Sequence, residues 1–111
     1  MRFLGYTLGD ESVPMPPPTP ELMEDMGKFI EEATQAGVFL TGGGMAPTAE
    51  GARVVLEKGE FTVIDGPFAE AKEIIGGWAI LECRDLDEAI EWTKRFLSVL
   101  GEGESRIRPV Y

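Results

Sequence analysis

Residues 63–77 read Val-Ile-Asp-Gly-Pro-Phe-Ala-Glu-Ala-Lys-Glu-Ile-Ile-Gly-Gly, and the rest of the chain is organised around this stretch. The apolar, β-branched run over 61–64 predicts a strand that leads into it. Asp65, Gly66 and Pro67 are three turn-forming residues in succession, so this strand must end there. Pro67 suits the first position of a helical turn, and good helix formers occupy 68–73. We therefore predict a strand, a sharp turn with a short turn of helix, and a second strand.

Two roles are open for this turn. Asp65 can act as a structural cap, because its carboxylate can accept hydrogen bonds from the amides that follow. Alternatively, Asp65 serves as a general base or ligand contact at the mouth of a pocket, and it is the one candidate catalytic residue. The candidate ligand-binding residues are Asp65, Gly66, Pro67, Phe68, Glu70 and Lys72.

Composition limits the classes of function. The 111 residues fit one domain, spanning 1–111. There are 20 acidic and 10 basic residues, and the resulting net charge of -10 repels phosphate backbones. Direct nucleic-acid binding is therefore disfavoured. This surface suits a cationic small molecule or a basic protein partner better.

The chain contains no histidine, which excludes Ser-His-Asp and Cys-His catalysis and the common zinc sites. The single cysteine, Cys83, cannot form an internal disulfide, and we expect a small buried hydrophobic residue in a cytoplasmic protein. The run Gly42 to Gly44 lacks the spacing of a dinucleotide-binding loop, so we expect no cofactor. We expect no metal site either, since carboxylates around one turn are weak evidence for one. No apolar run reaches the roughly 20 residues that span a bilayer.

The first half of the chain predicts a strand over 2–8, a proline-rich extended loop, and a helix capped by Thr19 with Pro20 at its first position. Gly37 lies where this helix should end. A strand over 38–41 follows. We expect the three glycines after it to form a flexible connector, and residues 45–51 to continue as a loop.

In the second half, strands over 52–57 and 60–64 flank Lys58-Gly59, the spacing of a tight hairpin, which we place at an edge or rim of the sheet. The apolar run 78–81 predicts a strand buried on both faces. Asp85 and Glu88 form a capping-box pattern before an amphipathic helix that ends at Gly101. The last strand spans 105–111, and Pro109 suits an edge position.

The resulting order predicts an α+β, ferredoxin-like antiparallel sheet with two helices on one face and an inserted β-hairpin. Two helices cannot cover both faces of such a sheet. The runs Phe3-Leu4, 38–40 and 78–81 are nevertheless apolar at consecutive positions. We therefore predict a homodimer in which two sheets face each other.

The chain resembles the YCII-related family, specifically the branch named for the tetrapeptide Asp65 to Phe68. The similar blocks are 37–43, 53–59, 63–77, 85–92 and 107–110. The resemblance implies a ferredoxin-like fold that forms dimeric α/β barrels. Some members have a proposed His-Asp pair in a pocket, which this chain cannot reproduce. Members of this branch also look like companions of extracytoplasmic-function sigma factors, which implies a regulatory partner.

Three hypotheses of function follow. The first is a small-ligand-binding or regulatory module, with a pocket between sheet and helices near the central turn. The second is an enzyme with Asp65 as general base and Lys72 or Arg53 stabilising a developing anion. The third is a module that recognises a basic protein through its acidic surface or its proline-rich loop.

Overall fold

The computed structural model describes residues 1–11, 13, 17–66 and 74–111. Its principal helices are α1 (Pro20–Gln35) and α2 (Leu86–Leu100), and a short 3-10 helix, η1, spans Thr48–Glu50. Its strands are β1 (Arg2–Gly9), β2 (Phe39–Gly44), β3 (Ala52–Glu57), β4 (Glu60–Asp65), β5 (Ile74–Glu82) and β6 (Glu104–Pro109). No helix in the described ranges is both long and apolar enough to cross a membrane.

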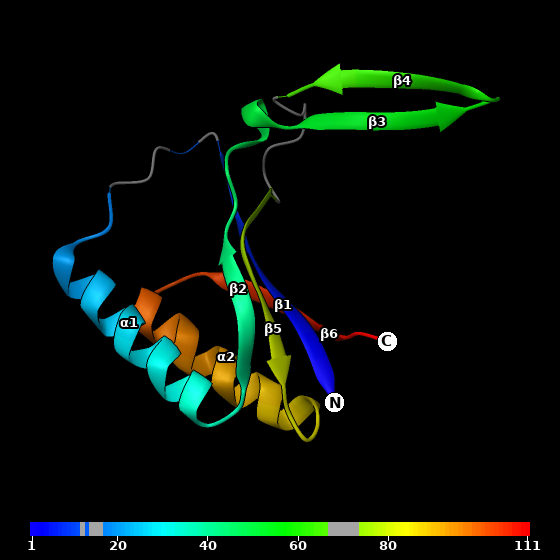
Figure 1. Ribbon diagram of the computed structural model, residues 1–111. Coiled ribbons are helices and arrows are strands. Elements are labelled where there is room, and N and C mark those ends of the chain that lie inside the picture. The colour runs from blue at the N-terminus through cyan, green and yellow to red at the C-terminus, as the bar shows by residue number, and fades with distance from the viewer. Residues whose placement is uncertain (12, 14–16, 67–73) are drawn as a thin grey trace.

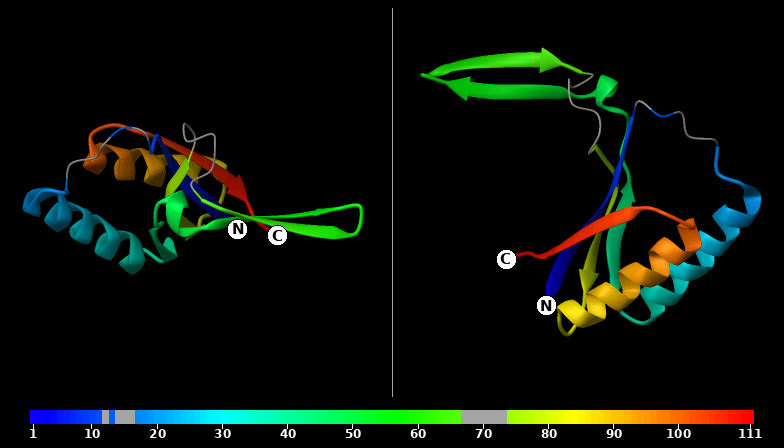
Figure 2. Two further views of the ribbon diagram at one scale, coloured as in Figure 1. Left: turned by 90° about the horizontal axis from the view of Figure 1, so that it is seen from above. Right: turned by 180° about the vertical axis from the view of Figure 1, so that it is seen from behind.

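Four strands form an antiparallel sheet in the order β2-β5-β1-β6. This order is the one expected of a βαββαβ sheet with a hairpin inserted before its third strand. Helices α1 and α2 lie side by side on one face of the sheet, and the opposite face carries no helix (Figures 1 and 2). The predicted α+β class and the placement of both helices are thus confirmed. A single copy leaves the sheet open, with β2 and β6 as its edges, so it forms no closed barrel over the described residues.

The helix boundaries follow from the predicted caps. The Thr19 hydroxyl accepts a hydrogen bond from the Leu22 amide at 3.1 Å, and the Asp85 carboxylate accepts one from the Glu88 amide at 2.9 Å. Glu88 completes the capping arrangement by accepting from the Arg84 amide at 3.1 Å. Gly101, in the left-handed region at φ 96°, ends α2.

The prediction of a glycine connector after residue 41 was wrong. The three glycines belong to β2, which pairs with β5 along Gly42 to Gly44. The reason is close backbone approach: a Cβ at Gly42 would lie 2.6 Å from the Trp78 carbonyl oxygen and 3.1 Å from the Ala79 Cα. The predicted loop over 45–51 likewise contains the helical turn η1.

The predicted hairpin is confirmed, with Lys58 and Gly59 both at positive φ in its turn. It does not extend the main sheet, however. Strands β3 and β4 form a separate two-stranded sheet that projects away from the helices (Figures 1 and 2). We call this hairpin, residues 52–65, the arm.

The hydrophobic core is small and lies under the helices. Phe3 is fully buried, and it packs with Val38, Cys83 and Ala89. Leu81, Trp92 and Ile107 surround this cluster. The core therefore joins three strands to α2.

Candidate functional site

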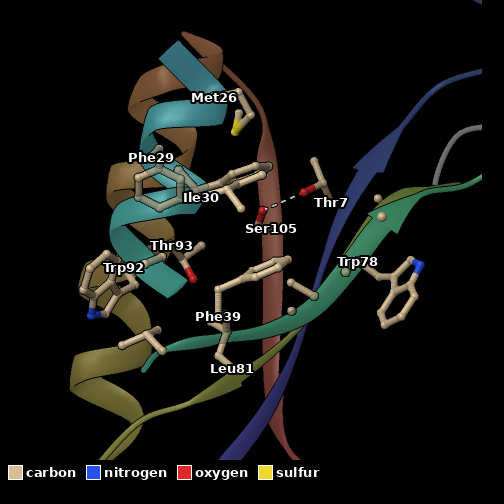
Figure 3. Close-up of a pocket in the computed structure, with 18 of the residues that line it drawn as sticks. Thr7, Met26, Phe29, Ile30, Phe39, Trp78, Leu81, Trp92, Thr93 and Ser105 are labelled. Atoms are coloured by element: carbon tan, nitrogen blue, oxygen red, sulfur yellow. Dashed lines mark hydrogen bonds between the residues drawn. The ribbon is translucent and has the colours of Figure 1, made fainter. Parts of the chain in front are cut away.

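A cavity of about 380 Å³ lies between the helices and the sheet (Figure 3). Both helices and strands β1, β2, β5 and β6 contribute to its wall. The lining residues are Gly5, Thr7, Met26, Phe29, Ile30, Ala33, Val38, Phe39, Gly42, Gly43, Gly44, Gly77, Trp78, Ala79, Leu81, Trp92, Thr93, Phe96 and Ser105. A pocket between sheet and helices was predicted, but Asp65 and Gly66, the described part of the central turn, do not line this cavity.

The cavity exists because its two walls differ in side-chain size. On the helices, Phe29 packs against Trp92 with ring centroids 6.0 Å apart and against Phe96 at 6.3 Å. The sheet opposite presents small residues, such as Gly5 on β1 and Ala79 on β5, which face each other in register. A Cβ added at Gly5 would meet no atom within 4 Å. The large side chains of the helices therefore face empty space above the small residues of the sheet.

Three of the described lining residues carry hydroxyl groups, namely Thr7, Thr93 and Ser105. Thr7 and Ser105 lie on neighbouring strands with their oxygens 3.0 Å apart, in a hydrogen bond that either can donate (Figure 3). Only one of the two hydroxyl hydrogens is used in that bond, so the pair can offer a donor and acceptor lone pairs to a guest. Thr93 instead donates to the Ala89 carbonyl of its own helix at 2.8 Å.

None of the described residues that line this cavity carries a charge. The wall therefore supplies neither a carboxylate nor an ammonium group for proton transfer. It suits an uncharged, largely apolar molecule, because a charged guest would lose its hydration without gaining an ion pair.

The Arg95 guanidinium on α2 links the two helices through contacts with side chains of α1. It stacks 4.6 Å from the Trp92 ring centroid and 5.5 Å from that of Phe29, and its Nη2 lies 2.6 Å from a Glu32 carboxylate oxygen. Because Glu32 and Phe29 belong to α1 and Arg95 to α2, these contacts hold together the two helices that roof the cavity.

The described part of the central turn lies elsewhere. Asp65 is exposed at the end of β4, and neither Asp65 nor Gly66 is among the described residues that line a cavity. Gly66 packs against η1, because a Cβ there would overlap the Thr48 carbonyl. The Glu11 carboxylate fixes Thr48 by accepting from its amide at 2.7 Å and from its hydroxyl at 2.6 Å. The turn thus joins the base of the arm to the chain after β1.

The register of the arm separates Asp65 from Arg53. Asp65 is opposite Ala52, whereas Arg53 is opposite Ile64, so the two charged side chains point to opposite faces of the arm. The structure does not bring this pair together. Pro67, Phe68, Glu70 and Lys72, together with the predicted helical turn, lie outside the described residues.

Within the described ranges, no cluster of three or more carboxylate or thiol groups could hold a metal ion. Cys83 is 3% exposed and lies in the core, which confirms the prediction of a buried hydrophobic residue. Burial, aided by the nearby Glu88 carboxylate, raises the pKa of its thiol. The thiol is therefore protonated and inert near neutral pH.

The raised thiol pKa gives a prediction for alkaline solution. Below the ordinary thiol pKa of about 8.5, both folded and unfolded chains hold the proton, so Cys83 adds no pH dependence. Above it the unfolded chain loses the proton first, and the free energy of unfolding should fall as the pH rises towards the native pKa. Urea titrations of wild type and Cys83→Ala along an alkaline pH series measure this difference. A parallel decline in both proteins would contradict it.

Met26, Phe29, Ile30 and Phe96 form the helical wall of the cavity, on two helices that the sequence predicts. The strands carry a sequence signal for the opposite wall. Gly5 and Thr7 are two positions apart on β1, and Gly77 and Ala79 are two positions apart on β5. Small residues at every second position leave one face of a sheet shallow. Set against an aromatic helix face, that pattern predicts a cavity.

Comparison with known proteins gives two findings. A family model described as a YCII-related domain matches residues 1–110. An uncharacterised protein of Rhizobium meliloti (strain 1021) is 30% identical over 90 residues, which cover 80% of this chain and 73% of that protein.

Proposed function

The chain belongs to the YCII-related family, and we propose that it is a small-ligand-binding module whose binding site is the cavity between the helices and the sheet. The observation that carries this proposal is an apolar cavity of about 380 Å³ whose described lining residues are all uncharged. That volume is in the range of known ligand sites. The ligand class is an uncharged, mainly apolar small molecule with one polar group placed against Thr7 and Ser105.

In this proposal the module works as a homodimer in which two open sheet faces meet and close a dimeric α/β barrel. The support comes from the sheet itself, because Leu40 and Ile75 are 45% and 39% exposed and no helix covers that face. A second copy would remove this apolar surface from water.

The proposal includes a regulatory role in the cytoplasm, with a sigma factor or another protein as partner. Its support is the resemblance to the branch of the family that carries the Asp-Gly-Pro-Phe motif. Ligand occupancy of the cavity would then be the signal that the partner recognises.

An enzyme that uses Asp65 as a general base is the alternative. Asp65 is accessible, which permits contact with a substrate, and Gly66 holds its turn firmly against Thr48. The uncharged wall favours the binding module, because acid-base catalysis needs a titratable group beside the bound molecule.

Gly5→Leu tests the binding site. Gly5 is not at positive φ, and the new side chain would extend into the empty part of the cavity. We expect wild type to bind the neutral fluorophore N-phenylnaphthylamine, and Gly5→Leu to lose most of that affinity while keeping or raising its melting temperature, since the leucine fills apolar space. Fluorescence titration and thermal unfolding measure the two quantities.

Gly9→Leu is the matched control. Gly9 lies on the same strand and faces the same side, it too has free space at Cβ, and it does not line the cavity. This variant should bind the probe as wild type does. Equal binding by Gly5→Leu and wild type would place the probe elsewhere and refute the proposed site.

A further inference from the structure

The arm presents an apolar face that nothing in the described chain covers. Val54 is opposite Val63 and Leu56 is opposite Phe61, so these four side chains share one face. They are 65%, 64%, 61% and 73% exposed, respectively. The other face is more polar, with Arg53, Glu57, Glu60 and Thr62 among its residues. We call the first the apolar face of the arm.

Such an arm needs a partner to be stable. Strands β3 and β4 are hydrogen-bonded only to each other over the described residues. A two-stranded hairpin alone in water is marginally stable, because it has no third strand or helix to pack against. Burial of four large apolar side chains against a partner would supply the missing stabilisation.

The surface area of the whole chain indicates how large that partner contact is. A compact monomer of 12.1 kDa exposes about 6,000 Å². This chain exposes 8288 Å², so the excess is about 2,300 Å². Its radius of gyration is 16.2 Å, against about 13 Å for a compact domain of this length. Obligate homodimers bury roughly 2,000–5,000 Å² over both subunits, and two copies with this excess fall in that range.

The open face of the main sheet is the surface that fits the arm. Tyr6 and Trp78 are opposite each other, and Tyr6 lies between the cavity-lining residues Gly5 and Thr7, so its side chain points to the open face. Figure 3 shows that the Trp78 side chain also points away from the helices, although Trp78 borders the cavity as well. With Leu4, Ile75 and Val110, Tyr6 and Trp78 line a hollow of about 550 Å³. The arm extends on this same side of the sheet (Figures 1 and 2).

We propose that the arm is an intersubunit clamp: its apolar face packs on the open sheet face of a second copy, around Tyr6 and Trp78, and the second arm does the same in return. This inference rests on the homodimer of the proposed function and names the element that holds it together. It does not depend on the ligand.

The test adds two charges to either face of the arm. The variant Leu56→Lys/Phe61→Lys changes one opposite pair on the apolar face. The control Val55→Lys/Thr62→Lys changes the next pair, on the other face. By light scattering over a dilution series, wild type and control should have twice the chain mass of 12.1 kDa. The apolar-face variant should dissociate at concentrations roughly 100-fold higher, as expected when two central interface side chains are lost.

The fluorescence of Trp78 tests whether the arm docks around this residue. In a Trp92→Phe background Trp78 is the sole tryptophan, and its emission should lie at shorter wavelength in the dimer than in the Leu56→Lys/Phe61→Lys variant. Deletion of 53–64 with a Gly-Gly link gives a second arm-less form, because β3 and β4 pair only with each other. It should fold as a monomer with red-shifted Trp78.

Each contrary result overturns a distinct statement. A wild-type protein that is monomeric throughout removes both the homodimer and the clamp. A dimer that survives arm deletion with unchanged affinity removes the clamp and leaves the sheet-to-sheet dimer standing. Dissociation without a change at Trp78 removes the docking site. Probe binding to the cavity, measured in the arm variants that keep Trp92, stays a separate readout of ligand function.

Discussion

Phe3→Ala should lower the free energy of unfolding by about 3–5 kcal/mol, which is a large part of the about 5–15 kcal/mol that stabilises a typical domain. Phe3 is the largest fully buried side chain of the described residues. It lies on β1 between Leu81 and Pro109 of the neighbouring strands, and it touches the cluster that joins the sheet to α2. Few other described residues are fully buried, so little else compensates for the lost contacts. Urea unfolding followed by circular dichroism at one fixed protein concentration measures the loss.

Phe3→Leu is the matched control for this prediction. Leucine keeps most of the apolar volume, so the remaining void and the loss should both be much smaller. An alanine variant as stable as the leucine variant would mean that this core carries little of the stability. The exposed apolar surfaces would then carry more of it through association.

The elements that the sequence predicts well are those whose causes are local. Thr19 and Asp85 cap helices by reaching amides three residues ahead, and Gly101 ends α2 through its own backbone freedom. The Lys58-Gly59 turn likewise determines the hairpin by itself. Each of these signals is complete within a few residues, so no tertiary information is needed to interpret it.

The features that the sequence does not predict depend on contacts between distant residues. Gly42 to Gly44 form a strand because the backbone of β5 approaches closely, and glycine by itself disfavours strands. The cavity depends on the different side-chain sizes of two facing surfaces, whose residues are distant in sequence, such as Gly5 on β1 and Phe96 on α2. The alternation of Val54 and Leu56 with Arg53, Val55 and Glu57 predicts that one face is more polar than the other, but it does not tell whether the apolar face covers the same chain or another copy.

Gly66→Ala should destabilise the protein at the upper end of the about 1–3 kcal/mol that is typical of overpacked sites. The added methyl group would overlap the Thr48 carbonyl, and Thr48 cannot easily move because Glu11 accepts hydrogen bonds from both its amide and its hydroxyl. The Gly66 amide also donates to the Gly51 carbonyl at 3.0 Å, which holds the turn from the other side. Thermal and urea unfolding measure the effect.

Gly76→Ala makes the same chemical change at a strand position where the nearest atom is 3.9 Å from the new Cβ, so its cost should be small.

Comparison of Gly66→Ala with Asp65→Asn then separates the structural role of the turn from a role in binding or catalysis. Asparagine keeps the ability to accept hydrogen bonds from nearby amides but loses the negative charge. A stable Asp65→Asn variant beside an unstable Gly66→Ala variant would assign the structural role to the glycine, and leave the Asp65 carboxylate free for a ligand or substrate. If both variants keep wild-type stability, the contact of Gly66 with Thr48 is not what holds the base of the arm.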